Sequence, residues 1–134
     1  MRRCDVADRK TIEATIRAYA AAWAAKDRGA WLNTFAEAAT QEDPVGSRVR
    51  RGRAEIGEFW DIAMAAYDSL EIVPRNVFVV GNEAAMEWTI TAVTARGGVT
   101  FAGVDLFVLN EAGHITSVRA YWERARAAEQ ESNA

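Results

Sequence analysis

The chain has 134 residues, of which half are hydrophobic and 26% are charged, and its net charge is −3. This length suits one domain with its own hydrophobic core, so a single domain is expected over residues 1–134, ordered from about 8 to 126 with a frayed C-terminal tail. The acidic balance disfavours nucleic-acid binding, and no apolar run reaches the ~18 residues that membrane insertion requires.

The first residues and the cysteine content predict a cellular location. Residues 1–5 (Met-Arg-Arg-Cys-Asp) lack the apolar stretch of a signal peptide. Cys4 is the single cysteine, so no internal disulfide can form. A cytoplasmic protein is therefore expected.

Three helices are predicted in the first half of the chain. The first covers residues 8–26, where apolar side chains recur on one helical stripe: Ile12, Ile16, Tyr19 and Trp23. Trp31, Leu32 and Phe35 indicate a short second helix, and a third runs from about Arg53 to Tyr67.

After Ser69 the apolar period changes from helical to alternating, which is typical of strands. Short glycine- and asparagine-containing turns separate the strands, so neighbours should be antiparallel. The predicted strands are 70–80, 84–96, 99–109 and 114–124. Helices followed by such a meander predict an α+β fold, with the helices on one face of a curved antiparallel sheet and a ligand cavity between them.

Metal and nucleophile chemistry find little support in the sequence. One histidine, His114, and one cysteine cannot form a zinc site, and His114 falls in a predicted turn. No glycine-rich phosphate loop follows a strand. We therefore expect no metal and no cofactor, and chemistry carried by carboxyl and hydroxyl groups.

Asp105 is the only charged residue of the predicted strand 99–109, whose two faces are both mostly apolar. A buried carboxyl must either pair with a cation or stay protonated. Arg119, on the next strand, offers an ordinary ion pair, so the residue alone leaves a structural and a catalytic interpretation equally open.

Two further residues are candidates for the same chemistry. Asp43 lies in Glu42-Asp43-Pro44-Val45-Gly46, where Pro44 favours an extended residue before it and a turn after it. Asp-Pro is also common in plain surface turns. Tyr19 lies on the buried stripe of the first helix, where a tyrosine usually needs only a hydrogen-bond partner.

Together these residues resemble the ketosteroid isomerases of the NTF2-like (SnoaL-like) superfamily, a cone of helices on a curved sheet. The resemblance spans about residues 10–124. It is carried by Tyr19, by the Asp43 segment followed by Arg51-Gly52-Arg53, and by the hairpin from Val104-Asp105-Leu106-Phe107 to Ala120-Tyr121-Trp122.

The resemblance implies a function and a role for each residue. Asp43 would be the general base, and Tyr19 and protonated Asp105 would donate to the carbonyl oxygen of a 3-oxo-Δ5-steroid, a case that is a standard example of a neutral buried carboxylic acid. It also implies a homodimer and an apolar substrate wall formed by Phe35, Trp60, Met86, Trp88, Val99, Phe101 and Trp122. Phe35 and Trp60 stand where some members have supporting tyrosines.

Other functions remain open at this point, since NTF2-like domains serve many of them. The alternatives are a polyketide cyclase or dehydratase, a non-catalytic carrier of hydrophobic ligands, and a dimeric interaction module. The arginines from Arg48 to Arg53 are interpreted as a solvated turn, or as a rim that meets an anionic part of a ligand.

Overall fold

The computed structural model describes residues 7–127 of the chain, so the predicted frayed tail lies outside the described residues. Helix α1 (Arg9–Ala25) begins at Asp8, whose carboxylate accepts a hydrogen bond from the backbone N–H of Thr11. It ends at Lys26 in the left-handed conformation. The two other main helices are α2 (Arg28–Asn33) and α3 (Gly52–Ala66).

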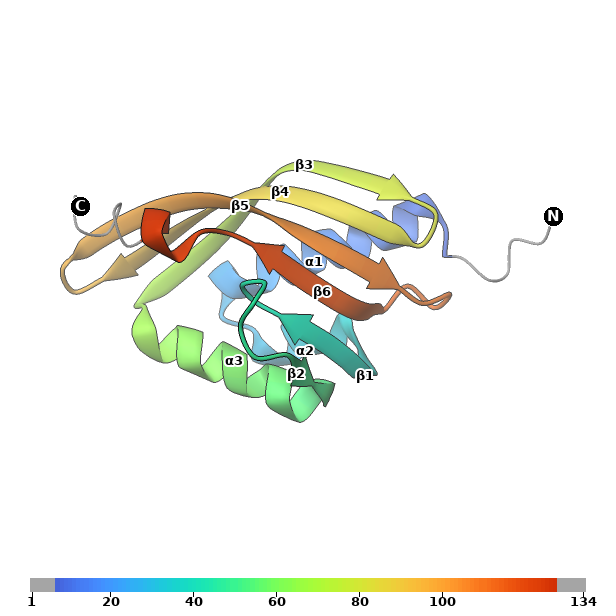
Figure 1. The fold of residues 1–134 in the computed structure, drawn as a ribbon, viewed down its shortest axis with the longest axis horizontal. Helices are drawn as coiled ribbons and strands as arrows, with labels where there is room; N and C mark the ends of the chain where they lie inside the picture. Colours follow the sequence, from blue (N-terminus) through green and yellow to red (C-terminus); the bar gives the residue numbers. More distant parts are fainter. Residues whose placement is uncertain (1–6, 128–134) are drawn as a thin grey trace.

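Six strands form one sheet: β1 (Phe35–Glu42), β2 (Arg50–Arg51), β3 (Ser69–Val80), β4 (Glu83–Thr94), β5 (Gly97–Leu109) and β6 (Ile115–Tyr121). Their order across the sheet is β2-β1-β6-β5-β4-β3 (Figure 1). The four predicted strands are confirmed as β3 to β6, with antiparallel neighbours.

Strands β1 and β2 were not predicted, and Phe35 begins β1 instead of belonging to the second helix. Strand β1 pairs with β6 in parallel, so the sheet is not antiparallel throughout. The alanine-rich sequence Phe-Ala-Glu-Ala-Ala-Thr-Gln-Glu hides the alternation of this strand. Its partner lies some 80 positions later in the chain, for example Gln41 beside Val118, so no local pattern reveals the pairing.

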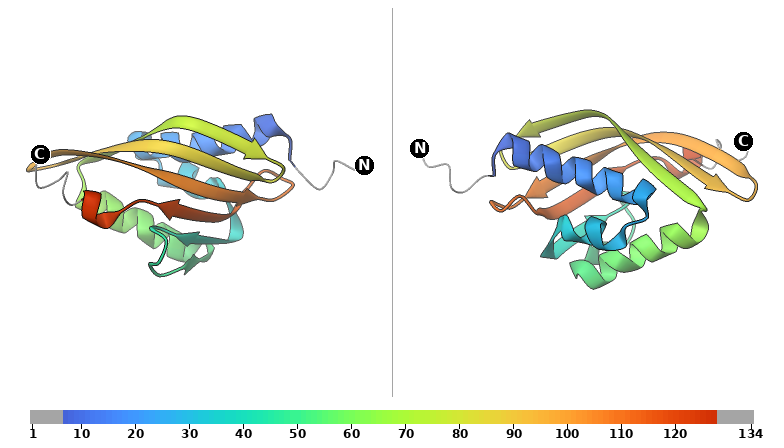
Figure 2. Two further views of the ribbon diagram at one scale, coloured as in Figure 1. Left: turned by 45° about the horizontal axis from the view of Figure 1, so that its top comes forward. Right: turned by 180° about the vertical axis from the view of Figure 1, so that it is seen from behind.

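All three helices lie on one side of the curved sheet, as the sequence predicts (Figure 2). Helix α1 packs on β3, and α3 packs against β1. The core between the layers is rich in aromatic rings: Tyr19, Trp23, Trp31, Phe35 and Trp60. Edge-on ring pairs such as Trp23 with Trp31, at 5.0 Å and 68°, each contribute about 0.5–1.5 kcal/mol beyond their buried area.

The α+β cone expected from the resemblance is therefore confirmed. Among residues 7–127, no helix is both long enough and apolar enough to cross a lipid bilayer.

Candidate active site

A cavity of about 410 Å³ lies between the inner face of the sheet and the helices α1 and α3. Binding sites for small molecules typically measure roughly 300–1,000 Å³. The cavity wall contains Tyr19 from α1, Asp43 from the end of β1 and Asp105 from β5. The fold thus brings together three polar side chains that are far apart in the sequence.

Tyr19 occupies the deep end of this cavity and is only 2% exposed. Its position follows from the apolar stripe of α1, which faces the sheet. The tyrosine ring meets Phe107 edge-on, with centroids 5.2 Å apart at 85°, and also contacts Trp31 and Phe35. These rings hold the side chain, so its hydroxyl is directed by packing.

Asp105 is also buried, at 4% exposure, and its partner is an indole. The Nε1–H of Trp88 donates a hydrogen bond of 2.9 Å to Oδ1 of Asp105. Trp88 lies directly opposite Gly103 on β5, where an added Cβ would come within 2.6 Å of the indole ring. The missing side chain of Gly103 therefore makes room for the ring that holds the aspartate.

The ion pair considered for Asp105 is absent. Arg119 donates instead to Oε1 of Glu42 at 2.9 Å. In the ladder between β5 and β6, Arg119 lies opposite Leu106, which points to the other face from Asp105 because successive strand residues alternate. The structural interpretation with Arg119 as the cation is wrong.

Burial and neighbouring charge favour the protonated forms of Asp105 and Tyr19. Burial, and then the charge of Asp43, raise the pKa of Asp105 well above its ordinary value. The hydrogen bonds from Trp88 and Tyr19 act in the opposite direction and are weaker. Burial, followed by the charges of Asp105 and Asp43, raises the pKa of Tyr19 well above 10.0. Both groups are therefore favoured as hydrogen-bond donors.

Asp43 is partly accessible from the cavity, and the turn that follows it is fixed by hydrogen bonds. The Nε1–H of Trp122 donates to Oδ1 of Asp43 at 2.7 Å. Glu42 accepts from the backbone N–H of Gly46, and Val45 donates to the carbonyl of Ala120 on β6. The position of Asp43 is thus fixed by hydrogen bonds within the turn that follows it and with residues of β6 and the segment after β6.

Burial raises the pKa of Asp43 from 3.8 to about 6, while the Trp122 hydrogen bond and the charges of Arg124 and Arg50 oppose this shift. At pH 7 this carboxyl is still mostly ionised. A carboxylate with such a pKa is a stronger base than a solvated aspartate and suits general-base catalysis near neutral pH. One cavity thus contains a carboxyl that is mostly ionised at pH 7, Asp43, and two groups whose pKa values are raised well above their ordinary values, Tyr19 and Asp105.

The expected wall residues fall into two groups. Trp88, Phe101 and Trp122 line the cavity. The other four expected wall residues lie in the core and outside the cavity lining: Phe35, Trp60, Met86 and Val99. Much of the apolar wall comes from residues that the sequence analysis did not single out: Phe59, Ile62, Ala63, Leu70, Ile72 and Ile90. Phe59 and Ala63 are four residues apart on α3, and this helical spacing of apolar residues could have indicated part of the wall from the sequence.

Within the described part of the chain, no three His, Cys, Asp or Glu side chains are grouped so that they could hold a metal ion. His114 lies in the loop between β5 and β6, and its backbone N–H donates to Asn110. It does not line the cavity.

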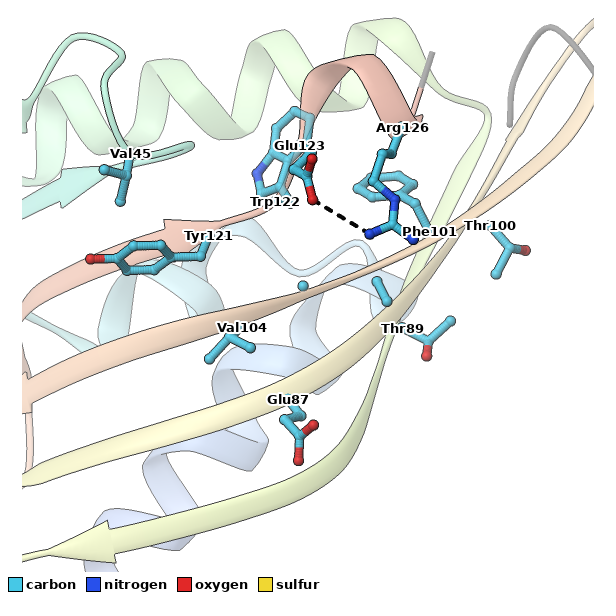
Figure 3. A pocket seen from close by; sticks show the side chains of 12 residues that line it. Val45, Glu87, Thr89, Thr100, Phe101, Val104, Tyr121, Trp122, Glu123 and Arg126 are labelled. Carbon is cyan, nitrogen blue, oxygen red and sulfur yellow. Dashed lines mark hydrogen bonds and ion pairs between the residues drawn. The ribbon is translucent and has the colours of Figure 1, made fainter. Parts of the chain in front are cut away.

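A larger hollow of about 970 Å³ lies mainly on the outer face of the sheet, beside residues 121–126 (Figure 3). Glu87, Thr89 and Val104 line it, together with Tyr121 and Arg126. Glu87 adjoins Trp88, so it points away from the inner cavity. Since Tyr19, Asp43 and Asp105 are all absent from this hollow, we assign the candidate site to the smaller inner cavity.

Fold and site together define a cone-shaped α+β domain that encloses a small-molecule pocket with two carboxyl groups in its wall. The chain belongs to the SnoaL-like domain family, whose sequence model matches residues 16–118. A Steroid Delta-isomerase from Nocardioides simplex is 32% identical over 111 residues, which cover 83% of this chain and 89% of that relative.

Two solved structures have similar folds. SalBIII, an epoxide hydrolase/cyclase-like enzyme in pyran ring formation in salinomycin, has a TM-score of 0.80 and 27% identity, covering 88% of this chain and 95% of its own. RV0760c from Mycobacterium tuberculosis, in complex with estradiol-17beta-hemisuccinate, has a TM-score of 0.77 and 25% identity, covering 86% and 95%. These comparisons support an isomerase or cyclase of the SnoaL-like type.

Proposed function

We propose that the protein is a cofactor-independent steroid Δ-isomerase, which converts 3-oxo-Δ5-steroids to the conjugated 3-oxo-Δ4 isomers. The observation that carries this proposal is the shared cavity of Tyr19, Asp43 and Asp105, with one carboxyl basic and the other protonated. The 32% identity to a Steroid Delta-isomerase and the steroid ligand of RV0760c support the substrate class.

In the proposed reaction, the Asp43 carboxylate removes a proton from C4, next to the substrate carbonyl. The electrons of that C–H bond move into the ring, and negative charge develops on the carbonyl oxygen of the dienolate. Protonated Asp43 then returns the same proton to C6, so the double bond moves without net loss or gain of atoms. No other reactant is consumed.

Tyr19 and protonated Asp105 donate hydrogen bonds to the oxygen on which this charge develops. Donors fixed in a buried site stabilise a transition state more than water does, and one such donor contributes about 3–4 kcal/mol. The N–H of Trp88 donates to Oδ1 of Asp105, so Oδ1 acts as the acceptor of the protonated carboxyl group. The proton is then on Oδ2, which is the donor to the substrate.

The direct test is to mix the protein with androst-5-ene-3,17-dione and to follow the ultraviolet band of the conjugated enone. Asp43→Asn protein serves as the matched control, because it preserves the size of the side chain and removes the base. Enone formation by native protein, much reduced in the control, supports the proposal. An equal rate in both proteins, or none in either, would contradict it.

A second candidate function follows from the likeness to SalBIII, an epoxide hydrolase/cyclase-like enzyme. An ionised and a protonated carboxyl in one apolar cavity also suit acid-base opening of an epoxide. Incubation with a hydrophobic epoxide, with product analysis by mass spectrometry, separates the two functions. A carrier without activity would bind steroid and leave both substrates unchanged.

We further propose a homodimer formed through the outer face of the sheet. Exposed apolar side chains gather there, such as Phe78 on β3 and Leu106 on β5, which both lie level with Ala85 on the intervening β4, and Val80 on β3 is 78% exposed. Exposed apolar patches of this kind mark contact surfaces. Light scattering should give twice the chain mass for native protein and the chain mass for Leu106→Glu. We also propose that the protein is cytoplasmic.

A further inference from the structure

The candidate cavity has a polar mouth as well as a catalytic end. Tyr19 and Asp105 form its deep end, whereas Arg48, Arg124 and Ile62 are exposed where the cavity opens to solvent. A ligand whose ketone reaches the deep end therefore has its opposite end near these arginines. The arginine side chains thus lie where the part of a ligand that takes no part in the chemistry would be.

Arg50 has unused hydrogen-bonding capacity in the cavity wall, although its side chain is only 17% exposed. Its Nη1 makes a 3.4 Å hydrogen bond to the carbonyl of Glu55 and a 4.0 Å ion pair with Glu58. Nε and Nη2 have no partner among the described residues. A guanidinium has five N–H donors, and leaving several unpaired in a partly buried position is unfavourable.

Arg124 approaches the cavity from the segment after β6 and has no ion pair or side-chain hydrogen bond within residues 7–127. Its guanidinium lies 5.4 Å from the ring centre of Trp122, as that of Arg50 lies 5.8 Å from the ring centre of Phe59. Both rings line the cavity. Contact through its flat face leaves the N–H edge of a guanidinium available to a carboxylate.

Neutralisation of Asp43 does not account for these two arginines. Their charges lower the pKa of Asp43, but less than burial raises it, and neither forms an ion pair with this carboxyl. The cavity wall has three arginines and two aspartates, and burial favours the uncharged form of Asp105. Arg48 forms ion pairs with Glu55 at 3.3 Å and Glu58 at 3.7 Å, outside the lining, whereas the contact of Arg50 with Glu58 is longer, at 4.0 Å. Arg50 and Arg124 are therefore the lining arginines with the most unused donors.

We infer that Arg50 and Arg124 form a binding subsite for an anionic group, so that the preferred ligand is a hydrophobic ketone with a carboxylate at the end remote from the ketone. This inference deepens the proposed function, on which the choice of a steroid skeleton rests. Binding of the carboxylate is separate from isomerisation and is measurable without turnover.

The test compares 3-oxoandrost-4-ene-17β-carboxylic acid with its methyl ester, which has nearly the same shape and no charge. Titration calorimetry at about pH 8 and low salt should give about ten-fold tighter binding of the acid, the gain expected for charge-assisted hydrogen bonds. The preference should decrease as salt is added. The preference for the acid should persist in Asp43→Asn protein, because it does not depend on the charge of residue 43.

Arg50→Gln and Arg124→Gln should each reduce the preference for the acid at least three-fold, by about the loss of one such contact. Arg124 is exposed, so its variant retains the fold even if Arg50→Gln does not. Arg75→Gln is the matched control, because Arg75 is exposed on β3, does not line the cavity and donates a side-chain hydrogen bond to Thr89, which is also outside the cavity lining. It should bind both ligands as native protein does.

Equal binding of acid and ester, or a preference that survives both arginine variants, would overturn the subsite and leave the isomerase proposal intact. If neither the acid nor the ester binds, both the subsite and the isomerase proposal are overturned. A retained preference for the acid in a protein that forms no enone would support the subsite and contradict only the isomerase.

Discussion

The indole Nε1–H of Trp88 donates a 2.9 Å hydrogen bond to Oδ1 of Asp105. The two residues are diagonal neighbours on adjacent strands, since Trp88 pairs with Gly103 and Asp105 pairs with Met86. This contact gives a buried carboxyl its orientation without supplying a positive charge. Asp105 can therefore remain protonated.

Trp88→Phe should preserve the apolar wall and remove the N–H donor. We expect kcat to fall about five- to fifty-fold, because the Asp105 proton is no longer confined to one oxygen and the donor is less well oriented. Stopped-flow enone formation measures this effect. An unchanged kcat, with intact fold by circular dichroism, would show that the hydrogen bond has no catalytic role.

Gly103→Ala tests the space that Trp88 occupies. The new Cβ would lie 2.5 and 2.6 Å from indole carbons and 2.6 Å from the carbonyl oxygen of Tyr121, so we expect a loss of about 1–3 kcal/mol of unfolding free energy. Gly98→Ala on the same strand is the matched control, since its new Cβ would lie 3.7 Å from the carbonyl oxygen of Ala92, an ordinary van der Waals contact. Urea unfolding of both variants compares the two sites.

Asp105 variants separate a neutral donor from a purely structural residue. Asp105→Asn retains a donor and an acceptor for Trp88, so we expect at most about a ten-fold loss of kcat, against roughly 10²–10³-fold for Asp105→Leu. Equal activity losses in the two variants, accompanied by equal losses of thermal stability, would contradict a donor role.

Asp43 should set the pH dependence of the reaction. Because the base must be ionised, kcat/KM should fall as pH decreases, with a midpoint near the Asp43 pKa of about 6. Asp43→Asn should lower kcat by about 10²–10⁴-fold. Glu37→Gln, an exposed change of the same charge on β1, should leave both the rate and the midpoint unchanged.

The same carboxyl should affect stability in the opposite direction. A pKa raised in the folded state means that stability is fully present below about pH 4 and is lost as pH rises through about 6. Relative to native protein, Asp43→Asn should therefore gain about 2–3 kcal/mol between pH 4 and pH 8. Denaturant unfolding at both pH values measures the difference. A constant difference would place the pKa of Asp43 near its ordinary value.

Local periodicity was sufficient for much of the fold. The stripe of Ile12, Ile16 and Trp23 predicted α1, and alternation after Ser69 predicted β3 to β6, because both patterns lie within one element. The same reasoning identified Asp105 as a buried charge, since one carboxyl in an apolar strand is visible without any partner. The neighbours of Asp105 on the sheet could not be predicted from this pattern.

Only the tertiary structure decided the contacts between elements. Strand β1 is recognisable through its pairing with β6, and that pairing brings Asp43 beside Trp122. The sequence predicted Trp88 and Trp122 as apolar wall, whereas their N–H groups orient the two aspartates. A hydrogen bond depends on the direction of two side chains from different strands, and the curvature of the sheet, which no local pattern specifies, sets that direction.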